Sequence, residues 1–239
     1  MSLLEGYELN TIWGYKTDGF WKSADEYAQY KADHPGYKTF NDGKIAGGDV
    51  KYVALGESDH QIGAGQGTKD DHGDLVYLGN SNARYLYGLN LSAQWKGFDL
   101  SIMFQGVGKR KVLIDAAALA PFYQTYQMPW TIHRDYWTED NQDAFWPRLC
   151  NYAGNDFNFK PSDRWVQDAS YIRLKNLTLG YTVPMKKTFV NRLRLYVTGE
   201  DIWEHSDMLK VFDPESGNNV GRSYYPFFRT WSFGVNITL

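Results

Sequence analysis

Five stretches of the chain alternate apolar and polar residues with a period of two, which is typical of β-strands with one apolar face. They span residues 84–95, 98–106, 170–183, 192–203 and 228–239. In the first stretch, Leu89 and Leu91 share the apolar face, whereas Asn90 and Ser92 lie on the opposite one. Lys96-Gly97 is a two-residue turn signal between the first two stretches, so residues 84–106 are predicted to form a long β-hairpin.

These strands are long for a water-soluble sheet. Each has about 10–13 residues, whereas strands of soluble proteins have about 5–6 and those of transmembrane barrels about 9–11. The connections alternate between short ones, at 96–97 and 184–191, and long ones, at 107–168 and 204–227. Outer-membrane barrels alternate short periplasmic turns with long extracellular loops in this way. The pattern favours antiparallel barrel strands and leaves a soluble β-sandwich as the alternative.

Five strands cannot close a membrane barrel, which needs at least about eight. We therefore expect residues 84–239 to be the C-terminal strands of a larger barrel, interrupted by two long loops. Residues 4–83 are rich in Gly and Asp and are predicted to form an extracellular loop-like region with one helix. The helix is expected over 24–33, where Ser23 and Glu26 have the spacing of a capping box. Residues 1–3 are interpreted as a leader added for expression.

Composition excludes several classes of protein. The 239 residues include 25 Lys and Arg and 28 Asp and Glu, and the net charge of −3 argues against a nucleic-acid-binding surface. No apolar run approaches the 18 or so residues of a transmembrane helix. Aromatic residues make up 17% of the chain, and several fall at strand ends, where barrels carry aromatic girdles. Cys150 is the single cysteine, so an intrachain disulfide is impossible.

Several ordered motifs resemble the SusC/RagA-type TonB-linked outer-membrane receptors, nutrient importers of the Bacteroidetes type. The most specific is the 168–181 segment, Asp-Ala-Ser-Tyr-Ile-Arg-Leu-Lys-Asn-Leu-Thr-Leu-Gly-Tyr. The other matching segments are Leu78–Asn90, Lys96–Arg110, Tyr136–Asn141, Pro147–Leu149 and Ser232–Asn236. The resemblance covers nearly the whole chain but only the C-terminal part of such a receptor. Leu239 departs from the Phe that usually ends the family's barrel.

The resemblance implies a function in energised import across the cell outer membrane. Receptors of this family form a barrel plugged by an N-terminal domain, couple to TonB and associate with a SusD-like surface lipoprotein. Their nutrients are typically oligosaccharides or peptides. The family's calcium-like loop is replaced here by residues 55–59, which lack the alternating oxygen ligands of an EF-type site. We therefore expect no metal and no cofactor.

The sequence offers no catalytic set, so we expect no enzyme. A glycoside hydrolase would need two carboxylates across a cleft, and the acids between Glu200 and Glu215 show no accompanying nucleophile or base. A soluble carbohydrate-binding module remains the main alternative. The candidates for contact with substrate or partner lipoprotein are five loop aromatics: Trp130, Trp137, Trp146, Tyr224 and Tyr225. Packing among themselves is the alternative role for these rings.

One face of the predicted sheet is apolar throughout. The residues expected to share it are Leu89, Leu91, Leu100, Ile102, Leu177, Leu179, Val235 and Ile237. In a complete receptor this face would contact membrane lipid. An open sheet with such a face and two free edges cannot stay exposed in water. The isolated chain is therefore expected to self-associate.

Overall fold

The computed structural model describes residues 6–56, 59–124, 126–185, 189–216, 219–220 and 227–239. The chain divides into two compact units that interleave along the sequence. The loop unit comprises Met1–Asn82, Lys111–Gln167 and Ser216–Tyr224, and the sheet unit comprises Ala83–Arg110, Asp168–Glu215 and Tyr225–Leu239. Residues 111–167 thus cluster with the N-terminal segment and not with the strands that flank them in sequence.

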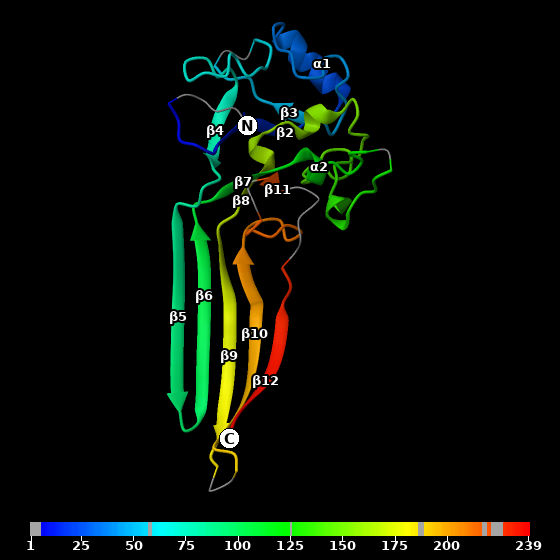
Figure 1. Cartoon of the computed structure of the whole chain (residues 1–239). Helices are drawn as coiled ribbons and strands as arrows, with labels where there is room; N and C mark the ends of the chain where they lie inside the picture. Colours follow the sequence, from blue (N-terminus) through cyan, green and yellow to red (C-terminus); the bar gives the residue numbers. More distant parts are fainter. Residues whose placement is uncertain (1–5, 57–58, 125, 186–188, 217–218, 221–226) are drawn as a thin grey trace. The chain divides into compact units, whose positions relative to one another are not determined.

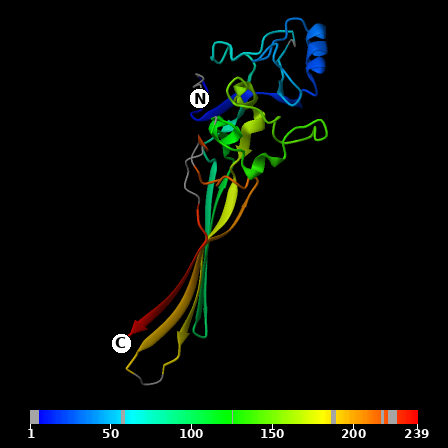
Figure 2. The ribbon, with the colours of Figure 1, turned by 90° about the vertical axis from the view of Figure 1, so that its right-hand side faces the viewer.

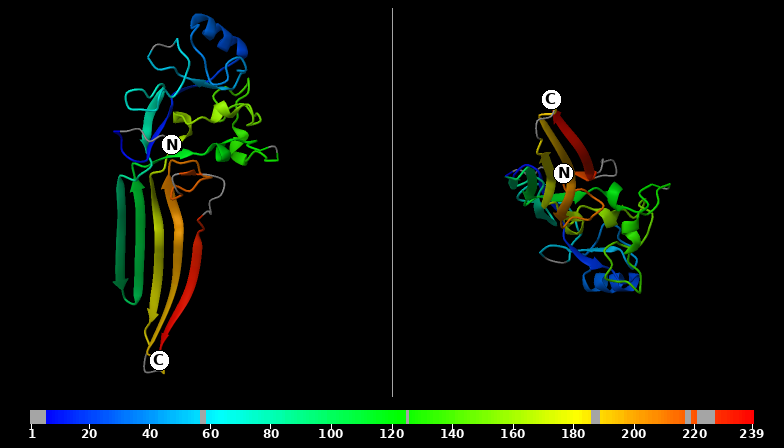
Figure 3. Two further views of the ribbon diagram at one scale, coloured as in Figure 1. Left: turned by 45° about the horizontal axis from the view of Figure 1, so that its top comes forward. Right: turned by 90° about the horizontal axis from the view of Figure 1, so that it is seen from below.

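The sheet unit is built on one antiparallel five-stranded sheet in the order β12-β10-β9-β6-β5 (Figure 1). The strands are β5 (Tyr85–Trp95), β6 (Phe98–Gly108), β9 (Tyr171–Val183), β10 (Arg192–Ser206) and β12 (Thr230–Thr238). Turned by 90°, they form a single twisted layer (Figure 2). β5 and β12 lie at its two edges (Figure 3, left). The predicted fold class is confirmed: the chain is mainly β-structure with helices in its loops, and its barrel-type strands do not close.

Strand register confirms the predicted apolar face. Residues paired directly across neighbouring strands lie on the same face of a sheet. Leu91 pairs with Ile102, which pairs with Leu177. The next row consists of Ala93, Leu100, Leu179, Val197 and Phe233. Below it lie Trp95, Phe98, Tyr181, Leu195 and Val235. The alternation of the sequence therefore continues across all five strands.

The backbone of the β5–β6 turn explains why Lys96 and Gly97 suit this position. Both residues have positive φ, 46° at Lys96 and 88° at Gly97, which is the backbone of a type I′ hairpin turn. A Cβ on Gly97 would lie 2.9 Å from the carbonyl oxygen of Thr182. Glycine at this position therefore permits both the turn and the close approach of β9.

A bulge near the middle of β9 and β10 was missed by the alternation pattern. Met103 pairs with Asn176 but Phe104 pairs with Leu174, so Lys175 is an extra residue in β9. In β10 the register shifts between Glu200 and Trp203. Beyond this bulge the strand continues to Ser206, three residues past its predicted end at 203. Bulges bend a strand and redirect its side chains.

In the loop unit, the predicted helix forms as α1 (Ala24–Asp33). Ser23 caps it, because its Oγ accepts a hydrogen bond of 3.0 Å from the backbone N–H of Glu26. The return bond differs from a standard capping box: Glu26 Oε2 accepts from the N–H of Lys22 and not from that of Ser23. Among the described residues, no helix is both long and apolar enough to cross a membrane.

Three small sheets and several short helical turns complete the loop unit. The strands are β1 (Thr11–Tyr15) with β4 (Leu75–Asn80), β2 (Thr17–Phe20) with β3 (Val50–Tyr52), and β7 (Lys111–Ile114) between β8 (Val166–Asp168) and β11 (Asn219–Val220). The helical turns are α2 (Ala116–Leu119) and 3₁₀ segments at Thr131–Arg134, Asp156–Phe159 and Asp163–Trp165.

Aromatic side chains form much of the loop unit's core. Trp21 and Tyr37 are fully buried, and Tyr52 is 1% exposed. Buried hydroxyls are satisfied by backbone carbonyls, since Tyr37 donates to Tyr52 at 2.8 Å and Tyr52 donates to Phe157. The first bond spans 15 residues and the second spans 105, so the high aromatic content serves first to build a core in a unit with little regular structure.

Candidate functional site

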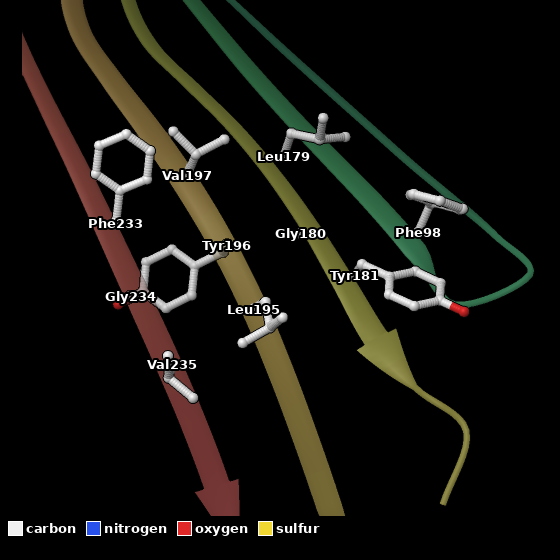
Figure 4. A pocket seen from close by; sticks show the side chains of 10 residues that line it. All are labelled: Phe98, Leu179, Gly180, Tyr181, Leu195, Tyr196, Val197, Phe233, Gly234 and Val235. Carbon is white, nitrogen blue, oxygen red and sulfur yellow. The ribbon is translucent and has the colours of Figure 1, made fainter.

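The apolar face of the sheet is an exposed surface with no covering layer among the described residues. Phe233 is 83% exposed and Leu91 is 49% exposed. Leu179, Val197 and Phe233 lie side by side across three strands and line a shallow hollow of about 460 Å³ (Figure 4). Soluble monomers rarely expose a continuous apolar surface of this kind. The face therefore requires a partner, and its strand lengths and alternation match those of strands that face lipid.

Exposed aromatic rings mark the ends of the strands. Tyr85 and Trp95, the first and last residues of β5, are 57% and 69% exposed. Trp231, the second residue of β12, is 57% exposed. Transmembrane barrels place amphipathic rings at the two membrane–water interfaces. The positions of these rings agree with that arrangement.

The opposite face of the sheet is polar and rich in small side chains. One row across all five strands consists of Ser92, Ser101, Thr178, Thr198 and Ser232. The hydroxyls of Thr178 and Thr198 are 2.9 Å apart. One glycine on this face, Gly234, lies beneath an aromatic ring. A Cβ on Gly234 would lie 2.1 Å from Cζ of Tyr196, so the ring fills the space above the glycine (Figure 4).

An ion pair crosses the same face near the β5–β6 turn. Asp99 on β6 and Arg194 on β10 form a bidentate pair, with Nε of Arg194 2.9 Å from Oδ1 of Asp99. The pair passes over Gly180 of the intervening strand β9, where a Cβ would lie 2.5 Å from Nη2 of Arg194. Glycine at this position lets two side chains bridge a strand that separates them.

At the other end of the sheet, a charge cluster joins the bulged strands to the segment that follows β10. Its members are Arg173, Lys175, Asp201, Glu204, Asp213 and Glu215. Arg173 is only 2% exposed and pairs with three of the acids. Nζ of Lys175 lies 3.1 Å from Asp201 and 2.8 Å from Glu215. A buried guanidinium needs such partners, because an unpaired buried charge is costly.

This cluster fixes the segment 207–215 to the sheet unit. Nη1 of Arg110 donates a 2.8 Å hydrogen bond to the carbonyl oxygen of Pro214, and Nη2 of Arg173 reaches Asp213. Met208 and Phe212 are 4% and 3% exposed. The segment is therefore anchored by apolar burial and by charge together. From the sequence alone, its acids were indistinguishable from solvated loop residues.

The loop aromatics selected from the sequence occupy different environments. Trp137 and Trp146 are 8% and 2% exposed, and Trp146 stacks on Trp165 with ring centroids 5.6 Å apart. A Cβ on Gly48 would lie 2.5 Å from Cε3 of Trp137, so that ring is closely packed as well. Trp130 is half-buried and keeps an accessible surface. Tyr224 and Tyr225 lie outside the described residues.

A buried polar network in the loop unit was not identified from the sequence. Asp49 is fully buried and accepts hydrogen bonds from Nε of Arg148 at 2.7 Å and from Nδ2 of Asn158 at 2.9 Å. Burial by itself would lower the pKa of Arg148, but the hydrogen bonds to Asp49 and the attraction of its carboxylate charge together outweigh burial and raise that pKa. The network ties Asp49 to two residues that lie 99 and 109 positions further along the chain. The one sequence feature that could have pointed to Arg148 was its place in the Pro147–Leu149 motif.

Cys150 lies beside this network and is half-buried. Burial raises the pKa of its thiol, which disfavours the reactive thiolate. Its Sγ lies 4.0 Å from Nδ2 of Asn158. Within the described part of the chain, no three His, Cys, Asp or Glu side chains are grouped so as to hold a metal ion.

No protein-family model matches the chain. It is similar to two receptors of Formosa agariphila. It is 28% identical to TonB-dependent receptor P26 over 252 aligned residues, which cover 99% of this chain and 23% of that receptor. It is also 28% identical to TonB-dependent receptor P3, over 69% of this chain and 17% of that receptor. The chain thus spans about a quarter or less of the length of these relatives.

Solved structures show the same fold. The RagAB peptide importer in its open-open state matches 99% of this chain and 24% of its own, with a TM-score of 0.64 and 19% identity. The RagAB peptide transporter matches 95% of this chain and 22% of its own, with a TM-score of 0.63 and 20% identity. The resemblance to SusC/RagA-type TonB-dependent receptors that the sequence motifs indicated is therefore confirmed.

Proposed function

We propose that this chain is part of an outer-membrane TonB-dependent receptor that binds and imports a nutrient. The observation that carries the proposal is the five-strand sheet, in which strands of 9 to 15 residues keep one apolar and one polar face. In the membrane the apolar face contacts lipid and the polar face lines the interior of the barrel. The long loops face the cell exterior, where nutrient arrives.

The same proposal includes two protein partners for the complete receptor. The complete receptor draws energy from TonB and works with a SusD-like surface lipoprotein that covers its extracellular mouth. The nutrient that we propose is an oligosaccharide or a peptide. Among the loop aromatics that the structure describes, Trp130 is the best placed for contact with nutrient or lipoprotein, because Trp137 and Trp146 are packed into the loop unit.

The soluble β-sandwich explains the structure less well. A sandwich buries its apolar face against a second sheet about 10 Å away. Here the apolar face of the five-strand sheet is exposed, and the described residues of the sheet unit provide no second sheet to cover it. No catalytic role is proposed either, since the similar proteins are receptors and transporters.

The test uses the full-length receptor in its own bacterium. Cells with and without the receptor gene are supplied with labelled peptide mixtures or labelled oligosaccharide mixtures, and uptake is measured in the presence and absence of TonB. We expect receptor-dependent uptake of one mixture that is lost without TonB, and recovery of the receptor in the outer-membrane fraction. A receptor found in the soluble fraction, or uptake that is independent of TonB, would overturn the proposal.

A further inference from the structure

The polar face of the sheet contains a hollow near the short β5–β6 turn that has no assigned role. Its volume is about 400 Å³. It is lined by Gln94, Asp99, Arg192, Arg194, Asn236 and Thr238. These residues belong to β5, β6, β10 and β12, and the pairing of Arg192 with Thr238 and of Arg194 with Asn236 places them on the polar face. The hollow is thus built by regular strands and not by loops.

The charges around this hollow do not cancel. Both carboxylate oxygens of Asp99 are occupied by Arg194. Arg192 forms no ion pair with any residue that the structure describes, and its side chain is exposed. One positive charge therefore remains, surrounded by the amide groups of Gln94 and Asn236 and the hydroxyl of Thr238. Guanidinium, amide and hydroxyl donors around one concavity suit a carboxylate, which can accept several hydrogen bonds.

We propose that this hollow binds a carboxylate from a part of the receptor outside these 239 residues, with Arg192 as its ion partner. The inference rests on the proposed function, in which the polar face lines the barrel interior. The chain spans 23% of the length of its relative, and the lumen of a 22-stranded outer-membrane transporter is plugged. Most of the polypeptide is therefore available to supply an acidic side chain to this surface.

The position of the hollow argues against the nutrient as its occupant. The hollow adjoins the two-residue β5–β6 turn, and a neighbouring polar hollow is lined by Lys96 and Gly97 of that turn together with Arg192. Short turns lie on the periplasmic side of outer-membrane barrels. Nutrient arrives from the opposite side, whereas an intramolecular acidic group can be present before any nutrient binds.

The experiment places a photocrosslinking amino acid, p-benzoylphenylalanine, at position 192 of the full-length receptor in outer membranes. Position 193 is the matched control, because Leu193 is the next residue on β10 and points to the apolar face. After irradiation, crosslinked peptides are identified by mass spectrometry, with and without the nutrient mixture. We expect position 192 to crosslink to an Asp- or Glu-containing peptide of the same receptor without nutrient, and position 193 to yield no receptor crosslink.

A crosslink only to nutrient, only to another protein, or to a receptor peptide without an acid would overturn the inference, as would the absence of any crosslink at 192. A second measurement compares loss of the charge at position 192 with its retention. In Arg192→Gln receptor the segment that crosslinks to position 192 should become more accessible to protease, whereas in Arg192→Lys receptor it should stay protected; equal protection in both variants would also overturn the inference. Recovery of the receptor in the outer membrane and its uptake activity are measured first, so failure of the proposed function would be recognised separately.

Discussion

Nη2 of Arg173 on β9 lies 2.8 Å from Oδ2 of Asp213, forty residues further along the chain. Arg173 is 2% exposed, while the Asp213 side chain is 13% exposed. The contact therefore ties the segment after β10 to the polar face of the sheet through a buried guanidinium. Glu204 and Glu215 pair with the same arginine, so one side chain neutralises acids from both the strand and the segment.

Substitution Arg173→Gln should destabilise the sheet unit and release the segment 207–215. Removing one partner of a buried ion pair leaves uncompensated charge and costs about 3–5 kcal/mol. We expect a lower melting temperature of the full-length receptor in detergent and faster proteolysis at 207–215. Lys160→Gln is the control, because the side chains of its pair with Asp156 are 36% and 47% exposed and exposed pairs contribute about 0.2–1 kcal/mol. Equal effects of the two variants would contradict this assignment.

A side chain at Gly234 should displace the ring of Tyr196. The two residues are directly paired across β10 and β12, and a Cβ on Gly234 would lie 2.1 Å from Cζ of Tyr196. We expect Gly234→Ala to cost about 1–3 kcal/mol, as overpacking usually does. Gly88→Ala is the matched strand glycine, since the nearest atom to its Cβ would be 3.6 Å away. Denaturation of the two variants in parallel measures the difference; a more stable Gly234→Ala would refute the packing argument.

A charge on the apolar face should impair membrane assembly. Leu91 is on the face proposed to contact lipid and Ser92 is on the opposite one. Leu91→Arg should cost about 2–4 kcal/mol if the residue lies at the bilayer midplane, whereas Ser92→Arg should be tolerated. The amount of heat-modifiable receptor in outer membranes reports assembly. If Leu91→Arg assembles as well as wild type while Ser92→Arg does not, the two faces have been assigned in reverse.

Cys150 should react slowly with alkylating reagents in the folded protein. Burial raises the pKa of its thiol, so a smaller fraction is thiolate at neutral pH than in an exposed cysteine, and thiolate is the reactive form. The rate should rise as the pH is increased toward the raised pKa. It should also rise at fixed pH after unfolding in urea. Alkylation of a receptor with Cys150 as its only cysteine tests this, and equal rates in both states would exclude a protected thiol.

The sequence was sufficient to predict the elements whose signal is local. All five long strands and α1 depend on alternation or on a cap within a few residues, such as Ser23 and Glu26. The shared apolar face also followed, because the period of two fixes side-chain direction once strands pair. These features need no knowledge of contacts between distant segments.

Most of the features that were not predicted depend on contacts between residues that lie far apart in the sequence. Asp49 and Arg148 are 99 residues apart, and their charges look like those of solvated loop residues in the sequence. At Lys175 the apolar positions change from Ile172 and Leu174 to Leu177 and Leu179, a break in the alternation that the prediction of one regular strand over residues 170–183 does not take into account. The burial of Trp146 likewise depends on its stack with Trp165, which no spacing rule indicates.

The isolated 239-residue chain should self-associate in detergent-free solution. Its apolar face includes Phe233 at 83% exposure and Leu89 at 52%, and burial of such surface yields roughly 25 cal/mol per Å². Size-exclusion chromatography with light scattering should show oligomers that dissociate when detergent covers the face. Changing Leu89, Leu91 and Phe233 together to Ser should weaken association, whereas changing Asn90, Ser92 and Ser232 to Ala on the other face should not. A monodisperse wild-type monomer without detergent, with the circular dichroism of a folded β-protein, would refute the prediction and favour the soluble sandwich.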